Sequence, residues 1–232
     1  MSNWERDTTR VIKNKLLEDV FFGEVPSDIF DWLKKIIQEV KEKNLDIRTT
    51  LAGHLNQEFE IYNRDRPPNG VVRPDSTNFL KYNQFISRCS FDEKFKRFWK
   101  RQVFLTKNCE LSISSTWVNF QKKYEFNPPH YHTGILSWII FMNIPYDLEE
   151  EDKVFPKLGV DSSTSRLSFL TVRGDEVGCI NHVRLNVDKS YEGKIVVFPS
   201  SQQHQVYPFY TSDDYRITVS GNVFFDVDKS TN

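Results

Sequence analysis

One stretch of the sequence, residues 127–144, reads Asn-Pro-Pro-His-Tyr-His-Thr-Gly-Ile-Leu-Ser-Trp-Ile-Ile-Phe-Met-Asn-Ile and decides how the fold is interpreted. Its second half is an apolar run of strand length, and its first half holds two prolines and a glycine, which are typical of turns. Residues i and i+2 of an extended chain point to the same side. His130 and His132 therefore present two imidazoles to one face at the entry of a strand.

Other segments after Cys109 have the same character. They are short, rich in Ile, Val, Phe and Thr, and separated by clusters of Gly, Pro, Asn and Asp. With the stretch at 134–144, they span residues 110–120, 166–172, 194–198 and 215–226. Several such strands in one half of a chain predict a sandwich or barrel, with the helical half packed outside it. The acidic run Glu149–Asp152 is then expected to be a solvated loop between strands.

The first hundred residues favour helices. One helix is predicted from an N-cap at Ser27 to a stop near Asn44, because its apolar residues recur at spacings of three and four. These residues are Ile29, Phe30, Leu33, Ile36, Ile37 and Val40. A second helical region is expected from Ser76 to about Lys100. We therefore divide the chain into a helical region, 1–105, packed on a β core, 106–232, with no flexible linker between them.

Composition excludes several classes of protein. The 232 residues hold 31 Lys and Arg against 32 Asp and Glu, a formal net charge of −1. This balance argues against a constitutive binder of nucleic acid or of acidic membranes. The three cysteines lack a Cys-x-x-Cys pair, so neither a disulfide framework nor a thiolate zinc site is indicated. With no signal pattern at its start and no apolar run of membrane-spanning length, the protein is expected in the cytoplasm.

A third histidine extends the pattern begun by His130 and His132. His204 follows the apolar segment Gly-Lys-Ile-Val-Val-Phe-Pro-Ser-Ser at residues 193–201. A His-x-His pair with a distant histidine on another strand is how barrel sites gather metal ligands from opposite walls, and such sites hold iron with open positions. The alternative for each histidine is a surface or hydrogen-bonded core residue. No sequence feature around His54 or His182 indicates a metal site, so we assign no role to either.

The segment 216–222, Arg-Ile-Thr-Val-Ser-Gly-Asn, alternates with period two. Arg216, Thr218 and Ser220 fall on one face, which could be the solvent-exposed face of a half-buried strand. Yet the strand follows His204 by a hairpin's distance, so Arg216 could instead stand beside His204 inside a barrel. A guanidinium there suits a bidentate grip on a ligand carboxylate, with hydroxyl bonds from Thr218 or Ser220.

Four segments together resemble a known family: residues 116–120, residues 127–134 leading to Ser137, residues 193–200 with His204, and residues 216–222. The sequence resembles the double-stranded β-helix oxygenases that depend on iron(II) and 2-oxoglutarate. Within these jelly-roll, cupin-like proteins it is most similar to the prolyl-4-hydroxylase-like members found in marine bacteriophage genomes. The resemblance covers roughly residues 110–225.

The resemblance implies a site and an activity. Iron would be held by His130, by the residue two positions on and by His204, and Arg216 would bind the far carboxylate of 2-oxoglutarate. The oxidative decarboxylation of 2-oxoglutarate with O2 would be coupled to oxidation of a substrate C–H bond, most simply hydroxylation. The residues expected to contact the co-substrate are Arg216, Thr218, Ser220, Asn119 and Ser137. The alternation of side chains along a strand does not by itself decide which of Trp117, Tyr131 and Trp138 also face the site.

One departure from the family concerns the third ligand, which is usually Asp or Glu and here is His132. Three arrangements stay open: His132 binds the metal, His132 only supports the ligands, or His132 is the first ligand and His130 supports it. A neutral ligand in place of an anionic one leaves the metal site one unit more positive. That should favour an anion, the co-substrate or a halide, in the open positions.

Two other functions remain as alternatives. A three-histidine cupin-type dioxygenase would need no 2-oxoglutarate, and Arg216 would bind the substrate's own carboxylate. A non-catalytic ligand-binding barrel would carry no metal. The substrate is expected to be a small molecule or a protein side chain, with no membrane partner and no nucleic acid. Whether the helical first hundred residues shape the substrate mouth or a homodimer interface stays open.

Overall fold

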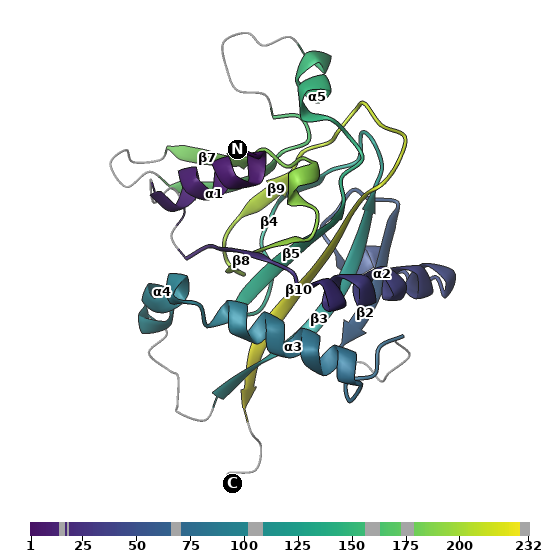
Figure 1. Ribbon diagram of the computed structural model, residues 1–232, viewed down its shortest axis with the longest axis vertical. Coiled ribbons are helices and arrows are strands. Elements are labelled where there is room, and N and C mark those ends of the chain that lie inside the picture. Colours follow the sequence, from purple (N-terminus) through teal and green to yellow (C-terminus); the bar gives the residue numbers. More distant parts are fainter. Residues whose placement is uncertain are drawn as a thin grey trace.

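Two antiparallel sheets form the body of the molecule (Figure 1). The computed structural model describes residues 1–13, 17, 19–65, 71–101, 109–155, 163–172 and 179–227, and in this part the sheets have six and four strands. The first has the order β1-β8-β5-β10-β3-β2 and the second β4-β9-β6-β7. Residues of both sheets line one shared cavity. Facing antiparallel sheets of this kind are a jelly roll, which confirms the predicted double-stranded β-helix with flanking helices.

The predicted strands are all present. In the six-stranded sheet, the bounds are β1 Phe21–Glu24, β8 Lys194–Pro199, β5 Leu136–Asn143, β10 Arg216–Val227, β3 Cys109–Gln121 and β2 Gln57–Asn63. In the four-stranded sheet, they are β4 Asn127–His130, β9 His204–Val206, β6 Leu167–Val172 and β7 Ile180–Leu185. Two strands lie in the region predicted to be helical: β1 pairs with β8, and β2 pairs with β3. The division at residue 105 stays a prediction, and the sheet extends across it.

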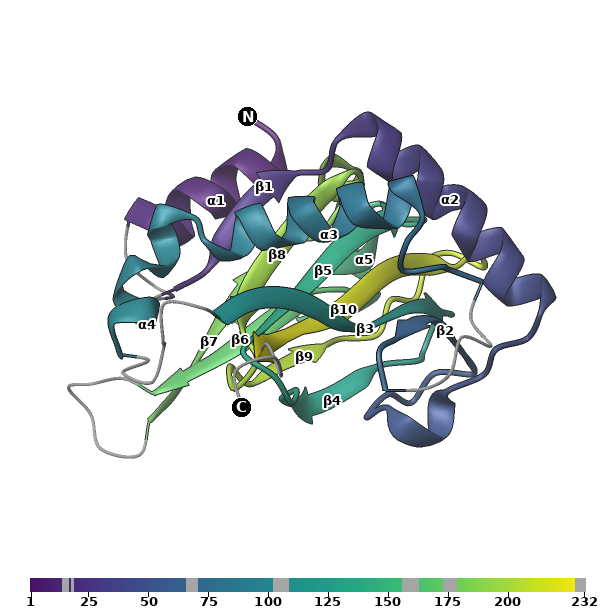
Figure 2. The same ribbon diagram turned by 90° about the horizontal axis from the view of Figure 1, so that it is seen from below.

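Helices cover the outer face of the six-stranded sheet. Figure 2 shows α1, α2 and α3 on one side of this sheet, with β4 and β9 on the other. The helices are α1 Asn3–Lys13, α2 Ser27–Glu42, α3 Thr77–Ser90, α4 Lys96–Arg101 and α5 Leu148–Val154, with 3-10 turns at Arg48–Thr50, Glu93–Phe95 and Lys189–Tyr191. Among the described residues, no helix is both long and apolar enough to cross a membrane.

The ends of α2 test two sequence predictions. Ser27 is the first residue of the helix and not its N-cap, which is Pro26 and makes no side-chain capping bond. Asn44 has a positive φ of 50°, just beyond the C-cap Lys43. A left-handed residue at this position ends a helix, and asparagine tolerates it better than most residues. The predicted stop is therefore confirmed and the predicted start is wrong by one residue.

Strand periodicity gives the six-stranded sheet two different faces. On the outer face, Val118, Ile140 and Val219 are fully buried in the cluster that α2 and α3 cover. Their neighbours Asn119 and Thr218 line the cavity between the sheets. Because successive side chains alternate, each central strand supplies the helix-facing core and the cavity at once.

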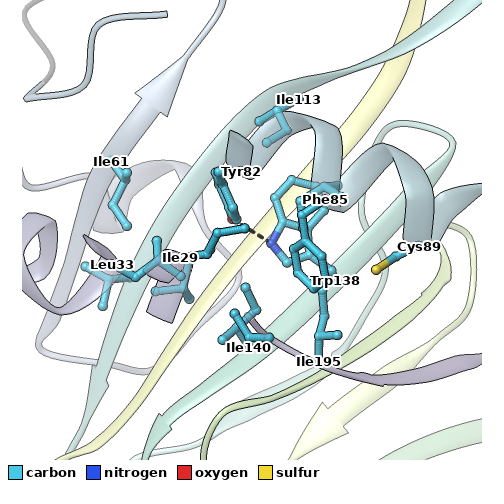
Figure 3. Packing of buried hydrophobic residues seen from close by; sticks show 14 of the residues in the cluster. Ile29, Leu33, Ile61, Tyr82, Phe85, Cys89, Ile113, Trp138, Ile140 and Ile195 are labelled. Carbon is cyan, nitrogen blue, oxygen red and sulfur yellow. Dashed lines mark hydrogen bonds between the residues drawn. The ribbon is translucent and has the colours of Figure 1, made fainter. Parts of the chain in front are cut away.

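The outer face is organised around Trp138 (Figure 3). Its indole Nε1 donates a hydrogen bond of 3.0 Å to the hydroxyl of Tyr82 on α3, and both side chains are buried. The ring also lies directly against Gly221 of β10, where a Cβ would come within 2.2 Å of the indole. Any side chain at Gly221 would therefore displace Trp138. Since Trp138 packs under the helices, it does not face the cavity.

The acidic run predicted to be a solvated loop is a helix with a buried carboxylate. Asp147 caps α5, accepting from the backbone N–H groups of Glu149 and Glu150. Glu151 is fully buried and accepts hydrogen bonds from the backbone N–H groups of Tyr210 and Thr211. The prediction was wrong because the partners that satisfy Glu151 lie sixty residues along the chain, where a local pattern cannot reveal them.

The Tyr82–Trp138 bond gives a stability prediction. Tyr82→Phe should keep the packing but leave the buried indole N–H without an acceptor, at a cost of about 1–3 kcal/mol in the free energy of unfolding. Chemical denaturation measures it. Tyr124→Phe, at a residue that is 62% exposed, is the control and should change stability little. Equal effects of the two substitutions would contradict the role given to this hydrogen bond.

Candidate metal centre

Three histidines meet where β4 pairs with β9. His130 and His204 are cross-strand partners in that ladder, and His132 lies two residues beyond the end of β4. The ring centroids are 4.3 Å apart for His130 and His204, 4.9 Å for His130 and His132, and 5.1 Å for His132 and His204. One ligand atom from each ring lies within 4.8 Å of the other two. Pairing of two short strands thus gathers residues more than seventy positions apart.

Backbone carbonyls orient two of the rings. Nδ1 of His130 lies 2.7 Å from the carbonyl oxygen of Pro128, and Nδ1 of His204 lies 3.1 Å from that of Gln202. A carbonyl oxygen only accepts, so Nδ1 carries the proton in both rings, and Nε2 keeps a free lone pair. Metal-binding histidines are commonly oriented in this way. His132 is fixed by its backbone N–H, which donates to Ser200, and by the Trp117 ring 5.4 Å away.

The surroundings keep all three rings neutral. Burial lowers the pKa of His132 to about 3, with a smaller contribution from His130. Burial also lowers the pKa of His130, and the pKa of His204 lies well below its ordinary value for the same reason. A neutral imidazole is the form that binds a metal. Near pH 7 the cluster therefore offers three nitrogen lone pairs without first losing protons.

A cavity of about 50 Å³ extends from the histidines between the two sheets. Among the described residues that line it, Arg216 is the only Lys or Arg, and no Asp or Glu is present. Four of the residues expected to contact the co-substrate line this cavity: Arg216, Thr218, Ser220 and Asn119. The fifth, Ser137, does not. Its hydroxyl donates to Asn222 Oδ1 at 2.6 Å and lies 2.8 Å from Ser200 Oγ.

The guanidinium of Arg216 already has an acceptor for each of its five N–H groups. Nε and one N–H of Nη2 donate to Gln121 Oε1, and the remaining groups donate to the Tyr146 hydroxyl and the carbonyls of Ser165 and Tyr207. A carboxylate that reaches Arg216 must therefore replace a protein acceptor. Gln121 is suited to this exchange because its side chain lines the cavity. Gln121 was not among the residues predicted from the sequence, although it shares the strand face of Asn119 two residues earlier.

The histidines also border a wider cleft of about 330 Å³. Its walls include Ile47, residues 50–53, the inner face of β2 and the end of β4 with Tyr131, whose side chain is 64% exposed. Glu58 of β2 lines this cleft with only 1% of its surface exposed. Burial, assisted by the nearby negative charge of Asp46, raises the pKa of Glu58 to about 7. No sequence pattern had indicated this residue.

The two remaining histidines lie elsewhere. The ring of His54 is stacked on Phe126 at 4.8 Å, and Nδ1 of His182 lies 3.4 Å from Ser168 Oγ on the neighbouring strand. Within the described part of the chain, the only group of three or more histidine, cysteine or acidic side chains close enough to hold a metal is the cluster of His130, His132 and His204.

The donor set fits iron(II) and a dicarboxylate. Three neutral imidazoles on one side of a cavity form a nitrogen-ligated mononuclear site with room for further ligands. The cation needed to bind an anionic group is supplied by Arg216. In addition, the buried oxygen Oδ1 of Asn119 has no hydrogen-bond partner, so the cavity wall holds a polar group that a ligand or water can satisfy.

A jelly roll with a histidine cluster and an arginine around one internal cavity defines the class of mononuclear non-haem metalloenzyme. Residues 115–222 match the profile of the family described as "Putative 2OG-Fe(II) oxygenase". This match agrees with the resemblance of the four sequence segments to oxygenases that use iron(II), 2-oxoglutarate and O2. The matched segment begins on β3 and ends on β10, so it contains the three histidines and Arg216.

One similar solved structure supports the fold, and a second is less similar. A Pseudomonas putida prolyl-4-hydroxylase is 10% identical over 97% of this chain and 98% of its own, with a TM-score of 0.53. A 2OG-Fe(II) oxygenase family oxidoreductase from Burkholderia pseudomallei is 13% identical over 95% of this chain and 89% of its own, with a TM-score of 0.46. No curated protein matches the sequence. The bacteriophage-type assignment stays a prediction.

The raised pKa of Glu58 predicts a dependence of stability on pH. A carboxyl group whose pKa is higher in the folded protein stabilises the fold below its unfolded pKa, near 4.5, and loses this contribution as the pH rises through 7. The difference is about 3 kcal/mol. Relative to the wild type, Glu58→Gln should therefore be more stable at pH 8 than at pH 5. Urea unfolding of both proteins at the two pH values measures this, and a pH-independent difference would contradict it.

Proposed function

We propose that this chain is an iron(II)- and 2-oxoglutarate-dependent hydroxylase in which His130, His132 and His204 bind the metal and Arg216 binds the distal carboxylate of 2-oxoglutarate. One observation carries the proposal. The lone pairs of three neutral histidines converge at one end of a cavity in which Arg216 is the single cation among the described lining residues. Thr218, Ser220 and Asn119 would add hydrogen bonds to the co-substrate.

When bound, iron and 2-oxoglutarate supply the oxidising chemistry: one atom of O2 enters the C–OH product, the other enters succinate, and the keto acid loses CO2. The protein's part is orientation and exclusion of water. The rings of His130 and His204 are held by backbone carbonyls, so their lone pairs need no reorganisation. The apolar part of the cavity wall, formed by Ile139, Phe141, Leu167, Val187 and Val206, would limit the entry of water.

A histidine in place of the usual carboxylate ligand would leave the positive charge of the metal uncompensated. With three neutral ligands, the metal keeps its full double positive charge, which favours a dianionic co-substrate. The guanidinium of Arg216 adds one more positive charge at the cavity, and it is already positioned by Tyr146 and two carbonyls. A ligand carboxylate that displaces the Gln121 side chain would replace a neutral acceptor with an anionic one and form a bidentate ion pair with the guanidinium.

We further propose a cytoplasmic setting, a substrate that is a small molecule or a protein side chain, and no membrane or nucleic-acid partner. The thiols of Cys89 and Cys179 are free, as expected in a reducing compartment, and iron(II) itself requires one. The formal charge of −1 gives little attraction for phosphates. That the chain forms a homodimer stays a prediction.

Metal titration tests the ligands. The wild type should bind one iron(II) per chain anaerobically, and adding 2-oxoglutarate should produce a weak visible charge-transfer band. His204→Ala should bind iron at least 100-fold more weakly, because it removes one of three ligands. His182→Asn is the matched control and should bind as the wild type does. Unchanged affinity in His204→Ala would overturn the assignment of ligands.

The variants His132→Ala and His132→Asp decide the role of the third histidine. If His132 binds the metal, His132→Ala weakens iron binding and His132→Asp restores it, because a carboxylate can take the same position. If His132 only supports the other ligands, the alanine variant keeps its iron and the aspartate variant gains nothing. Isothermal calorimetry under nitrogen distinguishes the two outcomes.

Arg216 should control the affinity for 2-oxoglutarate. Arg216→Lys is expected to raise the half-saturating concentration at least tenfold while iron binding is unchanged, because lysine lacks the bidentate fork. Thr218→Val, which keeps the guanidinium, is a milder second variant in case the buried lysine impairs folding. Succinate release is the measurement. Oxygen consumption that needs no 2-oxoglutarate would instead identify a three-histidine dioxygenase, and a chain purified without iron, nickel or zinc would identify a non-catalytic barrel.

A further inference from the structure

The charged residues described in the lining of the cleft beside the histidines are all acidic. Both acidic residues that line it, Glu58 and Glu60, lie on β2, and none of the described lining residues is Lys or Arg. In the ladder between β2 and β3, Glu58 pairs with Asn119 and Glu60 with Trp117. Paired residues of an antiparallel ladder point to the same side, so both carboxylates lie on the cavity side of the sheet. The described lining of the open approach to the proposed metal therefore holds carboxyl groups and no basic side chain.

Glu58 carries an acceptor without a donor. The residue is 1% exposed, and its oxygen Oε2 is buried with no hydrogen-bond partner. Arg48, whose positive charge lowers the pKa of Glu58, makes a bidentate ion pair with Asp46 and forms no hydrogen bond with Glu58. A buried carboxylate without a donor is costly, and proteins retain such groups where a ligand satisfies them. Glu60 differs, because it accepts a hydrogen bond from Asn63.

A second acceptor without a donor converges on the same place. Oδ1 of Asn127 is buried and has no hydrogen-bond partner, and Asn127 lies three residues before His130 on β4. Gly53 marks where the two groups approach each other: a Cβ on this glycine would lie 2.8 Å from Asn127 Oδ1 and 3.0 Å from Glu58 Oε1. Both residues and Gly53 line the cleft. The missing partner must therefore bring hydrogen-bond donors, and the carboxylate favours a positive charge.

We propose that this cleft binds a protonated primary amine of the substrate, held by Glu58 and Asn127, so that the enzyme hydroxylates a C–H bond of an amine-bearing molecule. The inference rests on the function proposed above and deepens it. An ammonium group has three donors and no acceptor, which matches two converging acceptors in a negative cleft. Its charge would also favour the ionised form of Glu58 against the nearby carboxylates of Asp46 and Glu125. The exposed ring of Tyr131 at the cleft would contact the rest of the molecule.

The amine could belong to a free alkylamine or to a lysine side chain, and matched probes separate the two sources. Butylammonium and 1-butanol differ mainly in charge, and so do an acetylated, amidated Gly-Lys-Gly peptide and its norleucine counterpart. Binding is measured by calorimetry on the metal-free protein and on the protein loaded with iron(II) and 2-oxoglutarate. At least one charged probe should bind tenfold or more tightly than its uncharged partner, and the pair with the larger preference identifies the source.

Three variants assign that preference to the cleft. Glu58→Gln has nearly the same shape without the charge and should lose the preference for the charged probe. Gly53→Ala should weaken probe binding at least tenfold, because its methyl group would occupy the space between the two acceptors. Glu39→Gln, on the exposed face of α2, makes the same change in net charge and should bind the probes as the wild type does.

The outcomes separate this inference from the proposed function. If iron and 2-oxoglutarate bind but charged and uncharged probes bind equally, the amine site is overturned and the oxygenase stands. Retention of the preference in Glu58→Gln overturns the role of Glu58 in the same way. If iron and 2-oxoglutarate do not bind, the proposed function fails first, and the metal-free measurements still decide whether the cleft binds an amine.

Discussion

The alternation of side chains along β10 is the constraint on which most of this structure depends. Val219 faces the helices and Gly221 leaves room for the indole of Trp138, while Arg216, Thr218 and Ser220 face the cavity. A shift of the register by one residue would bury the arginine against an apolar helix face and expose the core. Hydrophobic burial on one face of the strand therefore fixes the orientation of the polar side chains on the other face. The position of the site depends on the packing of the core.

The buried polar groups of the described residues fall into two kinds. Some are fully satisfied by the protein, as in Arg216 with its five hydrogen bonds and Glu151 with the backbone of residues 210 and 211. Others, including oxygens of Glu58, Asn119 and Asn127, are buried without a donor. The first kind holds the two sheets in place, because a half-satisfied network would destabilise them. Glu58, Asn119 and Asn127 line the two cavities beside the histidines.

Much of the site could be predicted from particular residues. The spacing of His130 and His132, the apolar strand that follows and the alternation after Arg216 located three histidines and an arginine that the fold brings to one cavity. Ser137 shares the strand face of Ile139 and Phe141 but does not line the cavity, because its hydroxyl is held in a network with Ser200 and Asn222. The alternation of polar and apolar residues could not place Trp138 either, because its neighbours on the same strand are equally apolar.

By itself, the sequence determined the strand periodicity, the pair of histidines two residues apart and the balance of charge, because these depend on neighbours along the chain. Only the tertiary structure decided that β2 completes the sheet, that Gln121 contacts Arg216 and that Glu58 meets Asn127 beside Gly53. Those contacts join segments about fifty to one hundred residues apart. They depend on strand order and register, which follow from how two sheets and their helices pack together.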